Sequence, residues 1–314
     1  MCKLSIIVPV YNTNIHLKKC IESILIQTTD DIEILVINDG STDSSGRILE
    51  KYAEQNPKRI TYYKKENSGI ADTRNFGISK AKGKYILFVD SDDYIKPNLI
   101  KDLQKYIEKN VDIIKFKLER VNEQGKVLEK VVGPVFEKVD GQTAFNLLCF
   151  SDVLLDSPCI YLFKKELFTN NMIFKVNTEH EDFGLIPLII IKAKSVVSID
   201  NYGYCYLQTS GSITRNEDYS KTLKKFNDAL LHYDTMLEFI EKQEITAKTK
   251  KNIKTYYTNA IILKLKEIKK QDIDIYIKKI KKRKMINNIQ VNNLKQVIKK
   301  MLLRINVKLY LTLK

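Results

Sequence analysis

The sequence predicts an α/β fold with an open, mostly parallel sheet, followed by a helical and strongly basic C-terminal extension. The first observation behind this prediction is a regular alternation of strand-like and helix-like segments between Leu4 and Val89. The second is the charge distribution, because residues 241–314 hold 21 Lys and Arg against 5 Asp and Glu while the whole chain has a net charge of +15. The preceding residues are close to neutral, so we expect an α/β domain over residues 1–215 and a helical region over residues 216–314.

The alternation starts with four short apolar runs bounded by turn residues, as buried strands are. They are Leu4–Val10, Ile32–Ile37, Ile60–Tyr63 and Tyr85–Val89. Helical periodicity falls between them, at Leu17–Leu25, at Ile48–Ala53 and from about Gly69 to Ala81. Since strand–helix–strand units are right-handed and join parallel strands, the four strands should form one sheet. Ligands bind at the carboxyl ends of the strands in such sheets.

The pattern weakens after residue 95. Leu99–Ile107 and Gln142–Phe150 have helical periodicity, and Val111–Leu118 is strand-like. From about Glu217 onward the pattern is helical only, and no Gly or Pro follows Gly211.

Cysteine usage and hydropathy indicate the compartment. The five cysteines are scattered and form no C-x-x-C pair, which argues against a disulfide framework or a zinc site and favours a reducing cytoplasm. Strand-like sequence begins at Leu4, so we expect no signal peptide. The longest apolar run, Leu185–Ile191, contains Pro187 and is far shorter than the roughly 20 residues that span a bilayer. Any contact of the protein with a membrane should therefore be peripheral, at the inner face of the cell membrane.

Polar residues follow each of the four expected strands. They are Tyr11 and Asn12 after the first, Asn38–Ser41 after the second, Glu66–Gly69 after the third and Asp90–Asp93 after the fourth. Because the carboxyl ends of parallel strands meet at one edge, these residues should surround a single ligand site.

The sharpest of these signals is the run of acidic residues at 90–93. Residues i and i+2 of a strand point the same way, so Asp90 and Asp92 should share one face at the strand end, with Asp93 turning outward beside them. Two carboxylates at such a short distance repel each other, and a bound Mg²⁺ or Mn²⁺ ion would relieve the repulsion. Mg²⁺ completes its shell with phosphate oxygens, which implies a diphosphate ligand. Taken alone, the motif also fits a solvated turn with helix-capping aspartates.

Two further clusters suit a nucleotide. Asp39 could accept hydrogen bonds from a base or ribose, and Gly40 would let the backbone approach it, although a tight turn with a helix cap uses the same residues. The third helix exposes unpaired N–H groups at its start, and Arg74, one turn in, could grip a phosphate bidentately. Arg74 could instead pair with Asp72 or Asp43.

Together these segments resemble the family 2 glycosyltransferases, which have the GT-A fold, a Rossmann-like and mostly parallel sheet. The matching motifs are Ser5–Asn12, Asn38–Asp43, Glu66–Gly69 with Arg74 and Asn75, and Asp90–Asp93. The resemblance implies a nucleoside-diphosphate sugar, UDP-linked, bound by residues 1–95, with the acceptor side in residues 96–215. It also implies a base pocket lined by Pro9 and Tyr11, nucleotide contacts from Asp39, Arg74, Asp90 and Ser91, and a Mn²⁺ or Mg²⁺ ion on Asp92 and Asp90.

Later residues extend the resemblance. Thr178–Phe183 is similar to the family's acidic catalytic motif, and Tyr204–Tyr206 with Gly211–Thr214 resembles a segment of its bacterial polysaccharide-synthesising branch. A sugar hydroxyl has a high pKa, so a carboxylate must take its proton during attack. We expect Asp182 to be this base, with Glu181 or His180 holding it or the acceptor. These acids could instead favour the dipole of a helix start.

The basic extension carries an apolar stripe between Leu294 and Leu309, with lysines and Arg304 on the other faces of one helix. Such a helix can lie at an anionic bilayer surface, where Lys278–Lys284 would add about 1 kcal/mol of attraction per charge. The stripe could equally pack against other helices. Nucleic acid is not the expected partner, because no groove-reading motif accompanies the basic residues.

These observations predict an inverting, metal-dependent glycosyltransferase that moves a sugar to a saccharide or lipid-linked saccharide in capsule, exopolysaccharide or other glycan synthesis. The Gln-x-x-Arg-Trp motif of processive enzymes is absent and the chain has no Trp, so we expect one sugar per encounter. One alternative is a haloacid-dehalogenase-like phosphatase, whose nucleophile also follows a strand, but here three strand–helix units precede the motif. The other is a non-catalytic membrane- or nucleic-acid-binding module that keeps only the fold.

Overall fold

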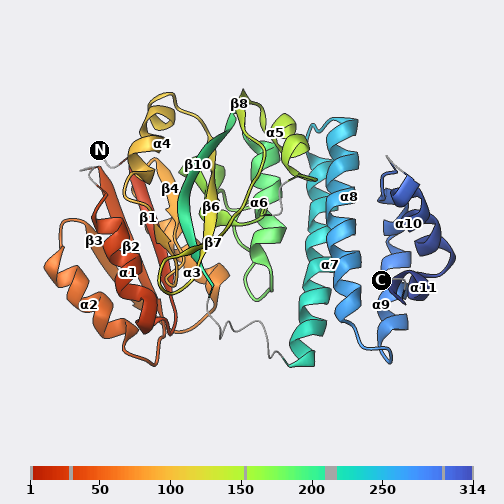
Figure 1. Ribbon diagram of the computed structural model, residues 1–314, viewed down its shortest axis with the longest axis horizontal. Coiled ribbons are helices and arrows are strands. Elements are labelled where there is room, and N and C mark those ends of the chain that lie inside the picture. The colour runs from red at the N-terminus through yellow and green to blue at the C-terminus, as the bar shows by residue number, and fades with distance from the viewer. Residues whose placement is uncertain (1–2, 28–30, 152–153, 209–217, 292–293, 313–314) are drawn as a thin grey trace. The chain divides into compact units, whose positions relative to one another are not determined.

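The computed structural model describes residues 3–27, 31–151, 154–208, 218–291 and 294–312 (Figure 1). Two compact units make up the chain, Met1–Ser212 and Ile213–Lys314. The first unit contains the sheet, and the second is helical in its described residues. The Gly211–Thr214 segment of the expected resemblance lies outside the described residues.

The four expected strands are present and parallel. They are β1 (Leu4–Val10), β2 (Ile32–Asp39), β3 (Ile60–Lys65) and β4 (Tyr85–Phe88). β1 lies between β2 and β4, and β3 flanks β2, as Figure 1 shows. All residues of β1 and β4 are buried, which fits strands covered on both faces of a parallel sheet. The N-terminal half of the fold is therefore confirmed.

Three helices connect these strands. They are α1 (Asn14–Leu25), α2 (Ser45–Gln55) and α3 (Ile70–Lys80). The Asp43 carboxylate caps two of them, since Oδ1 accepts a hydrogen bond from the Ser45 N–H (2.9 Å) and Oδ2 accepts one from the Asn14 N–H (3.1 Å). One aspartate thus fixes the starts of α1 and α2 beside each other at the carboxyl ends of β1 and β2.

The sheet continues beyond β4 with mixed strand directions. The further strands are β5 (Tyr94–Ile95), β6 (Ile113–Val121), β7 (Val127–Lys130), β8 (Phe136–Val139), β9 (Tyr161–Lys164) and β10 (Val196–Leu207). The strand order is β3-β2-β1-β4-β9-β6-β10-β5, with β7 on β6 and β8 on β10. β9 runs antiparallel to β4 and β6, whereas β6 and β10 are parallel. The sheet is therefore parallel in the half that carries the strand-end motifs and mixed in the other half.

The first unit has three more helices and two short 3₁₀ helices within its described residues. They are α4 (Leu99–Glu108), α5 (Gly141–Leu148), α6 (Glu181–Lys192), η1 (Pro158–Ile160) and η2 (Lys165–Leu167). α5 packs closely on α6, because a Cβ at Gly141 would lie 2.0 Å from the Ile190 carbonyl oxygen. The apolar run at Leu185–Ile191 is thus a buried helix of the core.

The second unit is a cluster of helices. They are α7 (Tyr219–Lys242), α8 (Ala247–Lys264), η4 (Leu265–Glu267), α9 (Ile273–Lys282), η5 (Met285–Asn288), α10 (Leu294–Ile305) and α11 (Val307–Thr312). α7 packs on α8, and η5 contacts α8, α9 and α10. Asn288 sits at this junction and donates through Nδ2 to the Tyr233 hydroxyl (2.7 Å).

The C-terminal apolar stripe differs from the expected single helix, because α10 and α11 are separate helices that meet at Asn306. Leu303 and Val307 are buried, whereas Met301 and Ile305 are 55% and 73% exposed. The side chains of Leu294 and Leu309 lie outside the described part of the structure. Within the ranges given above, no helix is both long enough and apolar enough to cross a membrane.

Candidate active site

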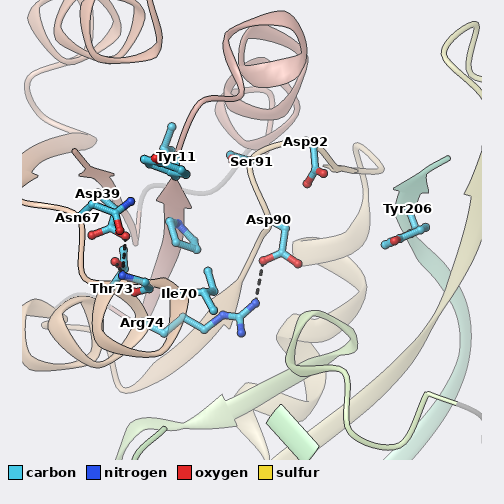
Figure 2. Close-up of a pocket in the computed structure, with 13 residues that line it drawn as sticks. Tyr11, Asp39, Asn67, Ile70, Thr73, Arg74, Asp90, Ser91, Asp92 and Tyr206 are labelled. Carbon is cyan, nitrogen blue, oxygen red and sulfur yellow. Dashed lines mark hydrogen bonds and ion pairs between the residues drawn. The ribbon is translucent and has the colours of Figure 1, made fainter. Parts of the chain in front are cut away.

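A cavity of about 490 Å³ opens at the carboxyl ends of β1, β2 and β4. Figure 2 shows Tyr11, Asp39 and Asn67 on one side of it, and Asp90, Asp92 and Tyr206 on the other. All residues expected to bind donor or metal line this cavity: Pro9, Tyr11, Asp39, Arg74, Asp90, Ser91 and Asp92. The four polar clusters therefore meet at one site, as the parallel strand order requires.

Asp39 ends β2, and its buried carboxylate binds the backbone of the turn just before α3. Oδ1 accepts hydrogen bonds from the Lys65 ammonium (2.5 Å) and the Ser68 N–H (3.0 Å), and Oδ2 accepts one from the Gly69 N–H (3.0 Å). A carboxylate has about four acceptor positions, so one remains for a ligand. Asp39 thus holds the turn between β3 and α3 in place and can still contact a nucleotide.

The glycine of this turn allows a close approach of two backbone segments. Gly40 has a φ of +71°, and a Cβ there would lie 2.7 Å from the Asn67 backbone nitrogen. Any larger residue would therefore push apart the turns after β2 and β3 that form this side of the cavity.

Arg74 lies on α3 and bridges two segments of the site. Its Nη2 donates to Asp90 Oδ1 (2.9 Å) and its Nη1 donates to Glu181 Oε1 (2.5 Å). Burial lowers the pKa of the guanidinium, but the charges of Asp90 and Glu181 outweigh it and leave the pKa raised. Each terminal nitrogen uses one of its two N–H groups in these bonds, so Arg74 bridges two carboxylates and still has donors left for a ligand.

The other partners considered for Arg74 are occupied elsewhere. Asp72 pairs with the Lys65 ammonium (3.1 Å), and Asp43 caps α1 and α2. Among the described residues, the Arg74 Nε–H is a buried donor without a hydrogen-bond partner. Leaving such a donor unsatisfied costs about 1–3 kcal/mol, so an oxygen from a bound ligand would be favourable here.

Glu181 and Asp182 begin α6, directly after His180, whose backbone is left-handed with a φ of 56°. Burial raises the pKa of Glu181 from 4.5 to about 7, despite the opposing charge of Arg74. Burial also raises the pKa of Asp182, whose Oδ1 accepts a hydrogen bond from the Phe183 N–H (2.7 Å). Neither carboxylate belongs to the lining of the 490 Å³ cavity formed by the described residues. Arg74, which lines the cavity, binds Glu181 directly.

Asp90 and Asp92 provide the pair of carboxylates expected for a metal. One oxygen of Asp90 accepts a hydrogen bond from Arg74. Partial desolvation by the surrounding protein, together with the charge of Asp90, raises the pKa of Asp92. Over the part of the chain that the structure describes, no group of three or more His, Cys, Asp or Glu side chains is arranged to hold a metal. Two carboxylates suit Mg²⁺ or Mn²⁺ when phosphate oxygens complete the shell, so these residues fit a metal shared with a diphosphate ligand.

Asp93 has a structural role that its position beside the motif does not reveal. It is buried, and its Oδ2 accepts a hydrogen bond from the Tyr204 hydroxyl (2.7 Å) while its Oδ1 accepts one from the Leu207 N–H (2.7 Å). The Tyr204 hydroxyl also accepts from the Asp90 N–H (3.2 Å). β10 is therefore tied to the acidic turn, and the expectation that Asp93 turns outward is wrong.

Ser91 and Tyr206 complete the cavity. The Ser91 hydroxyl accepts a hydrogen bond from Thr13 Oγ1 (2.8 Å), which ties the acidic turn to the start of α1. Tyr206, on β10, is 43% exposed and faces Tyr11, 50% exposed, across the cavity in Figure 2. Tyr206 was not among the expected site residues, although it stands in the tyrosine segment that resembles the family.

Sequence comparisons identify relatives of the chain. A family model described as glycosyl transferase family 2 matches residues 5–170. The chain is 34% identical over 227 residues to the glycosyltransferase GlyG of Streptococcus pneumoniae. This alignment covers 68% of this chain and 73% of GlyG. It is 28% identical over 255 residues to the minor teichoic acid biosynthesis protein GgaB of Bacillus subtilis, covering 76% of this chain and only 27% of GgaB. This chain thus spans about a quarter of GgaB.

Solved structures share the fold. TarS residues 1–349 from S. aureus, in complex with UDP-GlcNAc, superposes with a TM-score of 0.71 at 20% identity, covering 99% of this chain and 90% of that one. The mannosyltransferase PcManGT from Pyrobaculum calidifontis, in complex with GDP-Man and Mn²⁺, gives a TM-score of 0.57 at 15% identity, covering 99% and 81%.

The family match, over residues 5–170, covers the strand-end motifs that line the cavity. They exclude the phosphatase and the non-catalytic module as alternatives, and the structural likeness confirms the expected GT-A fold. The chain belongs to glycosyl transferase family 2 and is a glycosyltransferase enzyme.

Proposed function

We propose that this enzyme transfers one sugar from a nucleoside-diphosphate sugar, with UDP as the nucleotide, to a hydroxyl of a saccharide or lipid-linked saccharide, with inversion at the anomeric carbon. The observation that supports this most is the cavity that gathers Asp39, Arg74, Asp90 and Asp92 at the carboxyl ends of β1, β2 and β4. The complexes of TarS with UDP-GlcNAc and of PcManGT with GDP-Man and Mn²⁺ share this fold and favour such a donor.

The nucleotide would occupy the side of the cavity formed by Tyr11 and Asp39. The exposed Tyr11 ring offers a stacking surface for a base, with Pro9 beside it in the lining. The fourth acceptor position of Asp39 is suited to a base N–H or a ribose hydroxyl. Residues 1–95 would thus bind the donor, and residues 96–215 would supply the acceptor side.

The diphosphate would lie near Asp90, Ser91 and Asp92. Mn²⁺ or Mg²⁺ held by Asp90 and Asp92 would neutralise charge on the departing diphosphate. The Arg74 Nε–H, unpartnered among the described residues, would gain a ligand oxygen as hydrogen-bond acceptor.

Asp182 would act as the base. As the acceptor hydroxyl attacks the anomeric carbon, Asp182 takes its proton, and the bond between that carbon and the diphosphate oxygen breaks. Attack from the side opposite the leaving group inverts the configuration. Arg74 would hold Glu181, and thereby the start of α6, in position relative to Asp90.

The acceptor would belong to bacterial cell-surface glycan synthesis, in a capsule, an exopolysaccharide or a lipid-linked intermediate. The name of GgaB, a minor teichoic acid biosynthesis protein, supports this class of pathway. The helical basic region would hold the enzyme peripherally at the anionic inner face of the cell membrane, because α10 has exposed apolar residues and the lysines of α8 line a basic cavity.

A thermal-shift panel of nucleoside diphosphates, with and without Mn²⁺, tests the donor site. A ligand at 100 times its dissociation constant adds about 2.7 kcal/mol to the free energy of unfolding, which raises the melting temperature measurably. Stabilisation by UDP that requires Mn²⁺ is expected. Stabilisation by GDP or another nucleotide would replace the UDP assignment, and no stabilisation by any of them would overturn the donor proposal.

A further inference from the structure

The helical unit contains a second cavity, of about 390 Å³, whose charged lining residues are all lysines. Lys250, Lys251 and Lys254 come from α8, and Lys300 comes from α10. Residues 287–291 complete the lining, and no acidic residue belongs to it within the described part of the unit. Four ammonium groups therefore face a space that no lining carboxylate neutralises.

The three lysines of α8 lie on neighbouring positions of the helix surface. Lys250 and Lys254 are one turn apart, and Lys251 is three residues before Lys254. Each of the three ammonium groups lacks an ion pair or hydrogen bond with any other described residue. They are thus available to a ligand from outside the chain.

The opposite wall is pinned in place by hydrogen bonds. The Lys300 ammonium donates to the carbonyl oxygens of Asn287 (3.1 Å) and Ile289 (2.6 Å). Gln290 Nε2 donates to Asn252 Oδ1 (2.6 Å), and the Thr255 hydroxyl donates to the Asn288 carbonyl (2.5 Å). The cavity is therefore preformed, and its volume falls in the range typical of small-ligand sites.

Lys300 is the cavity lysine that contacts the opposite wall. Two of its three N–H groups bind the carbonyls of the wall, so one remains. Burial and the nearby charges of Arg304 and Lys251 lower its pKa. An anion in the cavity would offset this mutual repulsion and would accept the remaining N–H.

Apolar side chains flank these charges. Val297, Lys300, Met301 and Arg304 follow the spacing i, i+3, i+4, i+7 and share one face of α10. Val297 and Met301 are 37% and 55% exposed, and Val291, which lines the cavity, is 46% exposed. A ligand with an anionic head and an apolar tail would contact both kinds of residue, whereas a free phosphate would leave the apolar ones in water.

We propose that this cavity binds the phosphate of an anionic lipid headgroup, with Val291, Val297 and Met301 against the apolar part of the bilayer. The proposal assigns the membrane contact of the proposed function to one defined site. It rests on that part of the proposed function and is independent of the transfer chemistry.

The test is sedimentation of the full chain with phosphatidylcholine vesicles that contain or lack phosphatidylglycerol. Lys251→Gln/Lys254→Gln removes two charges from the cavity without touching the hydrogen bonds of its wall. Lys242→Gln/Lys270→Gln removes two exposed charges from the same unit, away from the cavity lining. Since each Lys at an anionic surface contributes roughly fivefold in affinity, the first variant should weaken binding by more than about tenfold and the second by less than about threefold.

Equal losses of vesicle affinity in the two variants would mean that the membrane attracts the basic charges of the unit as a whole. That result would overturn the proposed lipid site. So would failure of the wild-type chain to sediment with the phosphatidylglycerol vesicles. Cavity-dependent binding of soluble glycerol phosphate that matches the vesicle affinity would assign the site to a free phosphate, and tighter binding of single-stranded DNA would assign it to nucleic acid. Either outcome would overturn the proposal that the cavity binds a lipid headgroup.

Two further measurements test the apolar contact with the bilayer and separate the lipid site from the proposed donor site. Val297→Ser/Met301→Ser should weaken vesicle binding but leave the affinity for glycerol phosphate unchanged, and equal vesicle binding would contradict the apolar contact. Both lysine variants should bind UDP as the wild-type chain does. If the wild-type chain fails to bind UDP but shows the vesicle results, the donor proposal fails and this one stands.

Discussion

Arg74 Nη1 donates to Glu181 Oε1 at 2.5 Å, although 107 residues separate them in the sequence. The same guanidinium binds Asp90 at 2.9 Å. This buried bridge joins α3, which borders the proposed donor cavity, to α6, which carries the proposed base. Arg74 therefore helps to fix the relative position of α3 and α6.

Arg74→Lys should reduce stability as well as transfer. Lysine keeps the charge, but a single ammonium cannot reproduce the planar fork that binds two carboxylates. Breaking a buried ion pair costs up to about 3–5 kcal/mol, so thermal denaturation should show a clearly lower melting temperature. Arg47→Lys, at an exposed position of α2, is the control and should change little. Equal melting temperatures for the two variants would contradict the bridge.

Stability should depend on pH through Glu181. Burial raises the pKa of this carboxyl from 4.5 to about 7, and a raised carboxyl pKa contributes stability that is present below about pH 4.5 and is lost as the pH rises through about 7. Over that interval the wild-type chain should lose stability relative to Glu181→Gln, which does not titrate. The measurement is the difference in melting temperature between the two proteins against pH, and a constant difference would show that the raised pKa is absent.

Asp182→Asn should abolish most of the turnover while leaving donor binding intact. A positioned general base contributes about 10²–10⁴-fold to the rate, so kcat should fall by that factor with the UDP affinity unchanged. Glu179→Gln is the matched control from the same acidic segment, outside α6. If both variants lost only stability, with kcat preserved, the acids would merely favour the helix dipole and the base would lie elsewhere.

Tyr204→Phe should destabilise the acidic turn. The change removes the hydroxyl that donates to Asp93 (2.7 Å) and accepts from the Asp90 N–H (3.2 Å), leaving a buried carboxylate short of one partner. Such a loss costs about 1–3 kcal/mol, which chemical denaturation can measure. Tyr202→Phe makes the same change at a half-buried position of β10, and it should cost much less. Similar losses of stability in the two variants would argue against a stabilising link from Tyr204 to the acidic turn.

The sequence predicts β1 to β4 well because each is a short apolar run between turn residues, and both of its faces are covered. β10 is harder to predict, because its pairing with β6 shifts register at Ser198/Tyr202 and again at Tyr202/Tyr204, so its burial does not alternate. β6 contains buried charged residues that are paired in space, as Lys117 is with Asp200 (2.7 Å). Such pairings cannot be inferred from periodicity.

The proposed donor side of the site is predictable for a related reason. Its residues directly follow parallel strands, and the topology alone brings them to one edge. The bridge from Arg74 to Glu181 and the bond from Tyr204 to Asp93 join segments over 100 residues apart, so only the tertiary structure reveals them. Those two contacts turn the expected free Arg74 and outward Asp93 into buried, paired groups.

Release of UDP from a UDP-sugar in the presence of Mn²⁺ tests the central claim most directly, because it requires the donor, the metal and the cavity together. The wild-type chain should release UDP, chelation should stop the release, and Asp92→Asn should slow it by on the order of 10²–10³-fold. Asp102→Asn, on α4 and away from the cavity lining, should behave as the wild type. Release that is indifferent to chelation and to Asp92→Asn would contradict the assignment of this cavity as the donor and metal site.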